Sequence, residues 1–458
     1  MSGVVAIPVW LLALILAFAA VTFASHFLFP SVRWFLRRRM ERAVARINRR
    51  LQRPVEPFKL LERHDRVLRL VYDPQVLAAA VRHARDTGMP EEVALQRATR
   101  YAREIVPGFS ATIYFGIAVR LARWLSRVLY RVQVFSADNP ALRGIDPEAT
   151  VVFVMNHRSN MDYVLVTWLA SRRMTLSYAV GEWARVWPLS FLIRAMGAYF
   201  IRRRDNDPLY RKVLERYVQM ATAEGVAQAI FPEGGLSLDG RVGAPRLGLI
   251  GYIHDGFARG GGRDVVFVPV GLSYDRVLED RLLTEAAATG QRRFRARPWT
   301  IARFVGRMAW RGLRGRFGGF GTVGVSFGTP VSLRRLLAEA PGTDVAALAD
   351  RLMAGVRRVV PVLPVPLVAA AIAGAGPGGL TETALPETLA ALRDRLRTQG
   401  ATLAVGMEDT ATLAAAALRP LVSRGIVTRQ DGRLLAAPGA GALLAFHAAP
   451  VLQHLQEA

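Results

Sequence analysis

Cysteine is absent from this chain of 458 residues, and lysine is nearly absent. Without thiols the chain has no disulfide, no thiolate metal ligand and no cysteine nucleophile. Lys59 and Lys212 are the only lysines among 61 basic residues, so arginine supplies almost all of the formal net charge of +25 at pH 7. No stretch clusters histidines and carboxylates at metal-ligand spacing, and we therefore expect no metal site.

Charged side chains are also missing from residues 4–29, which are mostly apolar. About 20 apolar residues are enough to cross the hydrocarbon core of a bilayer. A signal peptide carries its positive charges in front, whereas here nine arginines follow, between residues 33 and 53. The positive-inside rule then puts the rest of the chain in the cytoplasm. We expect an uncleaved single-pass anchor in the cell membrane; a buried or interfacial helix is the alternative.

Arginines alternate with apolar and aromatic residues in two other stretches, residues 113–128 and 292–316. In the first stretch Ile117, Leu121 and Trp124 recur at helical spacing. The mixture suits an interface with anionic membrane lipids. It also suits nucleic acid, or one solvated face of a packed helix. The expected anchor favours anionic lipids as partners over nucleic acid.

Short apolar runs alternate with helical segments in the middle of the chain, which predicts an α/β domain with a mixed, largely parallel sheet flanked by helices. The flanking regions are rich in alanine, leucine and arginine and read as helical. The expected strands are residues 151–155, 198–201, 226–231, 265–272 and 322–327. The expected parts are a membrane anchor (1–32), a helical membrane-associated region (33–138), the α/β domain (139–335) and a C-terminal helical domain (336–458).

The most informative stretch runs from Asn156 to Asp162, directly after the first expected strand. With His157 in the strand-to-helix turn, Asp162 in the first helical turn can reach back to it. A carboxylate on one imidazole nitrogen leaves the other nitrogen as a general base. Since the chain lacks cysteine, that base would act on serine, threonine, water or a substrate hydroxyl. The alternative is a helix cap by Ser159 or Asn160, with Asp162 accepting only first-turn amides.

Two arginines, Arg202 and Arg203, end the expected strand at residues 198–201. Arginine binds phosphate through paired hydrogen bonds, so the two side chains are candidates for a phosphate site. A solvated basic strand end is the alternative.

Glu233, Gly234 and Gly235 follow the strand at residues 226–231. Glycines can present bare backbone amides to a phosphate or an oxyanion, and the alternative is an ordinary tight turn. Pro269 interrupts the strand at residues 265–272, which suggests an edge strand or a bulge. A plain core strand is the stronger interpretation there.

In this order, the four segments resemble the four motif blocks of the glycerolipid acyltransferases, most closely the glycerol-3-phosphate 1-O-acyltransferase branch. His157 and Asp162 match the family's His-x4-Asp motif, whose histidine is the general base. Residues 197–203 match the second block, whose arginines are associated with the substrate phosphate. Residues 231–237 match the third block, with Glu233 and Gly234 at its most characteristic positions, and Pro269 matches the fourth.

Details of these blocks point to the same branch. Glu-Gly-Gly at residues 233–235 is similar to enzymes of the first acylation step, whereas relatives that acylate lysophosphatidic acid typically have Glu-Gly-Thr-Arg-Ser. Leu236 departs from the pattern because an arginine usually follows Gly-Gly. Arg241 matches a later basic position and is the candidate for that phosphate contact, so the identity of the acceptor depends on it.

The resemblance implies transfer of a fatty acyl group from acyl-CoA or acyl-carrier protein to the sn-1 hydroxyl of glycerol 3-phosphate, the first step of phospholipid synthesis. The acyl thioester is a co-substrate, and no other cofactor is implied. Dihydroxyacetone phosphate or lysophosphatidic acid is the alternative acceptor, and a basic lipid-binding protein without catalysis is the alternative class. The implied catalytic residues are His157, Asp162, Glu233 and Gly234. The implied substrate-binding residues are Arg158, Ser159, Arg202, Arg203, Gly235, Ser237, Arg241 and Pro269.

Overall fold

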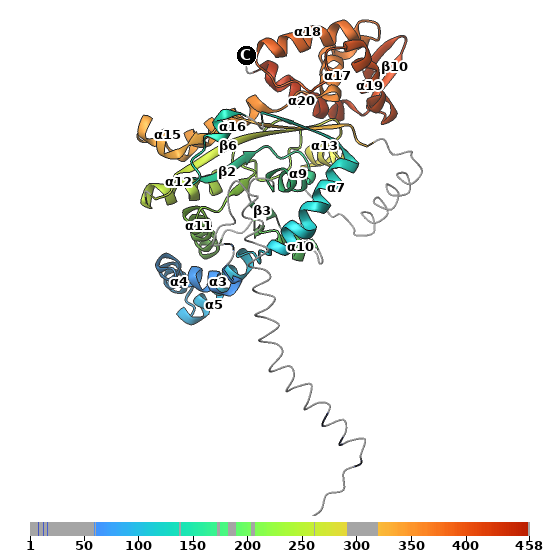
Figure 1. Cartoon of the computed structure of the whole chain (residues 1–458). Helices are drawn as coiled ribbons and strands as arrows, with labels where there is room; N and C mark the ends of the chain where they lie inside the picture. The colour runs from blue at the N-terminus through green and yellow to red at the C-terminus, as the bar shows by residue number, and fades with distance from the viewer. Residues whose placement is uncertain are drawn as a thin grey trace, which may run out of the picture. The chain divides into compact units, whose positions relative to one another are not determined.

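The computed structural model divides the chain into two units, Met1–Val55 and Glu56–Ala458, and the second unit carries the folded elements treated below (Figure 1). The described residues are Pro8, Leu12, Leu16, Lys59, 61–136, 139–171, 175–181, 189–202, 207–260, 262–290 and 319–456.

The expected N-terminal membrane anchor is not supported. Across the described ranges, no helix is both long and apolar enough to cross a bilayer. Residues 4–29 lie outside those ranges except for Pro8, Leu12 and Leu16, as does the arginine-rich stretch at residues 292–316. The expected fold class is therefore wrong in including an anchor, and so is the expected single-pass localisation.

An eight-stranded sheet runs through the described part of the second unit, in the order β1-β7-β6-β2-β5-β3-β4, with β8 also paired to β6. Every pairing is parallel except those of β6 with β7 and β8. The mixed, largely parallel sheet is confirmed. The strands are β1 (Arg131–Phe135), β2 (Thr150–Met155), β3 (Ser177–Gly181), β4 (Tyr199–Ile201), β5 (Gln228–Ile230), β6 (Val265–Tyr274), β7 (Thr322–Phe327) and β8 (Val331–Ser332).

Both faces of the sheet are covered by helices, which explains why β2 and β6 are apolar at consecutive positions. Val152 and Val154 pack into one hydrophobic cluster, while Val151 and Met155 pack into another on the opposite face. The first cluster includes residues of α3 (Arg63–Val71), α4 (Pro74–Thr87), α5 (Glu91–Ile105), α11 (Pro208–Ala223), α12 (Gly248–Gly260), α15 (Leu333–Glu339) and α16 (Val345–Val359). The second includes residues of α7 (Val119–Leu129), α9 (Met161–Ala170), α10 (Leu189–Ala195) and α13 (Asp280–Thr289).

Pro269 lies in an internal strand, so the suggested edge strand is wrong and the stronger interpretation, a core strand, is confirmed. On one side of β6 it is aligned with Val154 of β2. On the other side, β8 pairs with Val266 and Phe267, and β7 pairs from Val270 onward. Pro269 falls between these two pairings, where its missing N–H interrupts neither ladder. The proline thus marks the position at which β6 changes neighbours.

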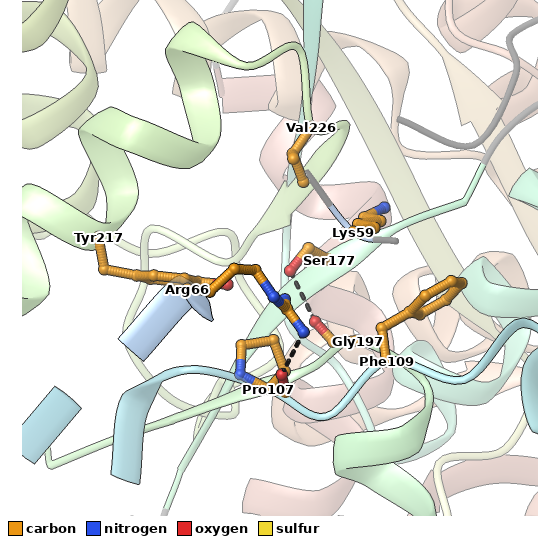
Figure 2. A pocket seen from close by; sticks show the side chains of 8 residues that line it. All are labelled: Lys59, Arg66, Pro107, Phe109, Ser177, Gly197, Tyr217 and Val226. Atoms are coloured by element: carbon orange, nitrogen blue, oxygen red, sulfur yellow. Dashed lines mark hydrogen bonds between the residues drawn. The ribbon is translucent and has the colours of Figure 1, made fainter. Parts of the chain in front are cut away.

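The helices that precede the sheet are joined to it by buried polar groups. Lys59 Nζ donates to the backbone oxygen of Thr175 at 2.7 Å. Arg66 Nη2 donates to the backbone oxygen of Pro107 at 2.9 Å. Arg66 and Pro107 line a small recess together with Phe109 and Tyr217 (Figure 2). Gly197, the first residue of the second motif block, also lines this recess, but none of the predicted catalytic or substrate-binding residues does.

The C-terminal region combines four helices with a three-stranded antiparallel sheet that the sequence did not predict (Figure 1). The buried Asp275, which follows β6, accepts hydrogen bonds from Thr322 N at 2.6 Å and Val365 N at 3.0 Å, and so connects this region to the large sheet. The expected division into four parts stays a prediction. The elements are α17 (Pro364–Gly374), β9 (Leu380–Thr381), α18 (Leu385–Thr398), α19 (Thr410–Ser423), β10 (Val427–Gln430), β11 (Arg433–Ala436) and α20 (Gly441–Gln456).

Gly271 of β6 provides a test of this packing. A Cβ there would lie 2.4 Å from Val359 O and 2.6 Å from Val360 Cα, both backbone atoms that no side-chain rotation can move. We expect Gly271→Ala to lower the free energy of unfolding by about 3 kcal/mol, the upper end of overpacking costs. Gly374→Ala is the matched control, because nothing lies within 4 Å of its added Cβ. Urea unfolding measures both variants, and equal stabilities would contradict the packing described.

Candidate active site

His157 and Asp162 meet in the turn between β2 and α9. The Nδ1 atom of His157 lies 2.9 Å from Asp162 Oδ2, and both side chains are buried. The same oxygen accepts the backbone N–H groups of Arg158 at 2.7 Å and Ser159 at 3.0 Å. Asp162 therefore binds two backbone amides of the turn that precedes α9 and orients the imidazole at once.

Tyr274, at the end of β6, donates its hydroxyl to the other oxygen, Asp162 Oδ1, at 2.6 Å. Burial raises the pKa of Tyr274 well above its usual value, and the hydroxyl stays a donor at neutral pH. Asp162 thus accepts from four donors, an arrangement that suits an ionised carboxylate. The contact between Tyr274 and Asp162, 112 positions apart, was not predicted from the sequence.

The second imidazole nitrogen of His157 faces an aromatic wall. Its Nε2 atom lies 3.4 Å from the hydroxyl oxygen of Tyr163, and the ring packs against Phe231 with centroids 4.3 Å apart. Since a carboxylate only accepts hydrogen bonds, Nδ1 donates to Asp162, and Nε2 carries the lone pair. A lone pair on an oriented, largely dry imidazole is what a general base needs.

Both carboxylate oxygens of Glu233 accept backbone N–H groups, one of them from the His157 turn. Its Oε1 accepts His157 N–H at 2.9 Å, and its Oε2 accepts Gly243 N–H at 3.1 Å. Desolvation raises the pKa of Glu233 to about 7, although both backbone hydrogen bonds and the nearby Arg158 lower it. Ser237 N–H donates to His157 O at 2.8 Å, so the third motif segment binds the histidine on both sides.

Gly234 and Gly235 complete this segment. Gly234 has a φ of +68°, and an added Cβ would lie 2.6 Å from Arg246 Cδ, so the turn requires glycine here. Its N–H donates to Phe231 O at 3.0 Å and is not the bare amide that the sequence suggested. Gly235 is buried beside it.

Arg158 is the largest fully buried side chain among the described residues. Its Nη1 donates to Gly240 O, and its guanidinium lies 4.6 Å from the centroid of the Phe446 ring. Nε and Nη2 have no hydrogen-bond partner within the described part of the chain. Burial lowers the pKa of Arg158 to about 10, opposed by Asp162 and Glu233. The group therefore stays cationic at neutral pH, and two of its buried N–H groups are left for an anion to satisfy.

Glu279 contacts the turn from the opposite side, a contact that was not predicted from the sequence. It accepts Ser159 Oγ at 2.8 Å, Asn160 N at 3.2 Å and Asn160 Nδ2 at 3.0 Å. Ser159, predicted to bind substrate, thus directs its hydroxyl to a carboxylate. Burial raises the pKa of Glu279.

Three other predicted residues lie outside the His157 turn: Ser237 and Arg241 in the loop after β5, and Pro269 in β6. Ser237 Oγ donates to Arg241 O at 2.7 Å, and Gly240 N donates to Ser237 Oγ at 3.0 Å. The exposed Arg241 donates to Gln456 Oε1 of α20 at 2.9 Å. Pro269 lies in β6, beside the strand that ends at the turn.

Arg202 is engaged with the helical layer. Its Nε and Nη2 atoms bind the carboxylate of Glu104 at 2.9 and 2.6 Å, and its guanidinium lies over the rings of Tyr101 and Tyr210. A phosphate bound by Arg202 would have to share or open this ion pair. Arg203 lies outside the described residues.

Two family models match the chain. Residues 138–273 match the model described as Acyltransferase, and residues 309–446 match the model described as Glycerol-3-phosphate acyltransferase C-terminal region. The first model contains His157, Asp162 and Glu233, and the second ends at Phe446.

The chain is also similar to curated proteins named glycerol-3-phosphate acyltransferase. That of Shewanella putrefaciens is 31% identical over 313 residues, which are 67% of this chain and 37% of the relative. That of Pseudomonas entomophila is 30% identical over 305 residues, 66% of this chain and 36% of the relative. The chain therefore spans little more than a third of the length of these relatives.

Among solved structures, the 1-acyl-sn-glycerophosphate acyltransferase PlsC of Thermotoga maritima is similar, with 17% identity and a TM-score of 0.32. The match covers 57% of this chain and 81% of PlsC. This likeness is too weak to carry an argument.

The raised pKa of Glu233 predicts a specific pH dependence. A carboxyl whose folded-state pKa is raised stabilises the fold most below its unfolded pKa near 4.5, and that contribution is lost as the pH rises through about 7. Glu233→Gln is neutral throughout and removes this loss. Between pH 5 and pH 8 we expect the wild-type free energy of unfolding to fall by about 2–3 kcal/mol more than that of the variant. Urea unfolding at both pH values measures it, and parallel pH dependences would contradict the assignment.

Proposed function

The chain belongs to the glycerolipid acyltransferase family, and on this premise we propose that it transfers a fatty acyl group from acyl-CoA or acyl-carrier protein to the sn-1 hydroxyl of glycerol 3-phosphate. That reaction would be the first step of phospholipid synthesis. The observation that carries the proposal is the buried His157–Asp162 pair, with Nδ1 on the carboxylate and Nε2 turned away from it. Dihydroxyacetone phosphate and lysophosphatidic acid are the competing acceptors.

The reaction needs no protein nucleophile. His157 Nε2 takes the proton of the acceptor hydroxyl as its oxygen attacks the thioester carbonyl. Asp162 stabilises the imidazolium that forms, while Tyr274 and the backbone amides of the turn keep the carboxylate in place. When the tetrahedral intermediate collapses, the C–S bond breaks and the imidazolium returns its proton to the leaving thiolate. The acyl thioester is the co-substrate, and we propose no other cofactor.

The acceptor phosphate is assigned to buried and surface arginines together. Arg158 supports this role best because its Nε and Nη2 groups are unpartnered beside the motif. Arg202, Arg203 and Arg241 are the other candidates. Ser159, Ser237 and Glu233 act by holding the turn, since their side chains form hydrogen bonds with other residues of the chain. Gly234 and Gly235 shape the loop, and Pro269 supports it from β6.

Replacing the base tests the proposal. We expect His157→Ala to lower kcat for acyl transfer to glycerol 3-phosphate by at least about 10³-fold, within the range of general-base contributions. The control is His254→Ala on α12, whose imidazole contacts Asp255 and Thr343 and none of the motif residues. Circular dichroism checks that both variants fold.

The acceptors are compared side by side in the same assay with each thioester. A preference for dihydroxyacetone phosphate or lysophosphatidic acid would replace the acceptor assignment. Full activity of His157→Ala would remove His157 as the base. Absence of transfer to all three acceptors would leave the alternative of a basic lipid-binding protein.

We propose anionic lipid as the surface partner. An exposed apolar stripe on a helix next to the site supports this proposal. Ile117, Leu121, Trp124 and Val128 are 59%, 45%, 60% and 42% exposed, and their spacing puts them on one helical face. The exposed Arg120, Arg123 and Arg127 flank the stripe. Helix α7 packs against α9, which carries Asp162. Apolar side chains with flanking arginines suit a bilayer surface that supplies acyl substrates and receives acylated product.

Vesicle flotation tests this partner. We expect Leu121→Ser with Trp124→Ser to lower binding to phosphatidylglycerol vesicles at least tenfold, since each lost side chain removes roughly 1.5–3 kcal/mol of apolar burial. Leu282→Ser on α13 is the control because Leu282 is 57% exposed outside the stripe. Equal flotation of all proteins, or binding unaffected by vesicle charge, would speak against the stripe.

A further inference from the structure

Two adjacent residues of the C-terminal helix α20 contact the supports of the His157 turn. Phe446 and His447 are both fully buried. The ring of Phe446 lies under the guanidinium of Arg158, 4.6 Å from centroid to Cζ. Gly240 passes so close that a Cβ there would lie 2.2 Å from Phe446 O and 2.8 Å from Arg158 Nη1. Arg158, Gly240 and Phe446 are therefore in close mutual contact, with no room for a side chain at Gly240.

His447 reaches a different support. Its Nε2 lies 2.9 Å from Asp280 Oδ2, at the first residue of α13. Arg424, at the end of α19, binds both oxygens of Asp280 at 2.8 and 2.6 Å. Asp280 is buried as well, so two C-terminal side chains determine the position of the N-terminus of α13.

The residue before Asp280 is Glu279, which accepts the three hydrogen bonds from Ser159 and Asn160. These two neighbouring carboxylates therefore have different partners: Asp280 binds the C-terminal region, and Glu279 binds the His157 turn. Because they share one peptide unit, a shift of Asp280 displaces Glu279. The path from His447 to the His157 turn therefore contains two hydrogen-bonded steps.

We propose that Phe446 and His447 are positioning residues for acyl transfer, an inference that rests on the proposed function. Phe446 sets the direction of the unpartnered Arg158 donors through its ring face. His447 sets the His157–Asp162 turn through Asp280 and Glu279. The C-terminal region thereby completes the active site without supplying a catalytic residue.

The two residues predict different kinetic defects. His447→Gln should lower kcat about tenfold and change either KM less than twofold, because it loosens the base. Phe446→Leu retains an apolar side chain and removes the ring face. It should raise KM for glycerol 3-phosphate about tenfold and change kcat less than twofold.

His454→Gln on the same helix is the matched control. His454 Nε2 binds Val360 O at 2.8 Å and contacts neither support of the turn. It should keep kcat and KM within twofold of wild type. Equal defects in His447→Gln and His454→Gln, or unaltered kinetics in both Phe446→Leu and His447→Gln, would overturn the proposal.

A double-mutant cycle separates positioning from general stability. In a Glu279→Gln background the link is already broken, so adding His447→Gln should lower kcat less than twofold further. If the two defects multiply, His447 does not act through Glu279 and the proposal fails in that part. Should His447→Gln not fold, Phe446→Leu still tests the Arg158 link through KM.

Hydrogen exchange of the turn amides gives a readout independent of activity. The N–H groups of Arg158 and Ser159 bind Asp162, and that of Asn160 binds Glu279. In peptides covering residues 157–162, His447→Gln should accelerate exchange at least tenfold and His454→Gln should not. If the wild type shows no acyl transfer but His447→Gln still accelerates exchange, the proposed reaction is refuted and the positioning of the turn is not. Active wild type with unchanged exchange would refute the positioning role alone.

Discussion

The buried carboxylate of Asp162 is the interaction on which the site depends. Removing a carboxylate from water costs several kcal/mol unless hydrogen bonds compensate it. Four donors do so here: the His157 imidazole, two backbone amides and the Tyr274 hydroxyl. Because these donors come from the turn after β2 and from β6, satisfying one acid also determines the geometry of the base. Stability of the turn and orientation of the imidazole have the same cause.

Around this centre, two further carboxylates hold the backbone of the turn. Glu233 accepts the N–H of His157, and Glu279 accepts that of Asn160. Desolvation raises the pKa of both carboxyl groups. Ordering the backbone of the turn with these buried acids therefore carries an electrostatic cost. Arg158 lies among these acids and stays cationic, which limits the net negative charge where an anionic acceptor would bind.

The sequence revealed the parts of the site that depend on local signals. His157 and Asp162 lie five positions apart, after an apolar strand, so their meeting follows from one turn. Tyr274 and Glu279 lie 112 and 119 positions from their partners, and no local pattern predicts such contacts. Pro269 suggested an edge strand because the proline rule considers one strand alone, whereas β6 is internal, as the stronger interpretation had it, and changes neighbours there. The apolar N-terminal run and the arginines that follow it suggested an anchor, which the described helices do not support.

The change of neighbour at Pro269 has a consequence for how the chain can vary. Upstream of the proline, β6 borders β8; downstream it borders β7 and leads to Tyr274 and Asp275. Inserting one residue between Pro269 and Tyr274 would reverse the facing of every side chain after it. The tyrosine would then leave Asp162, and Asp275 would leave Thr322 and Val365. The number of residues between Pro269 and Tyr274 is therefore more strongly constrained than their apolar composition.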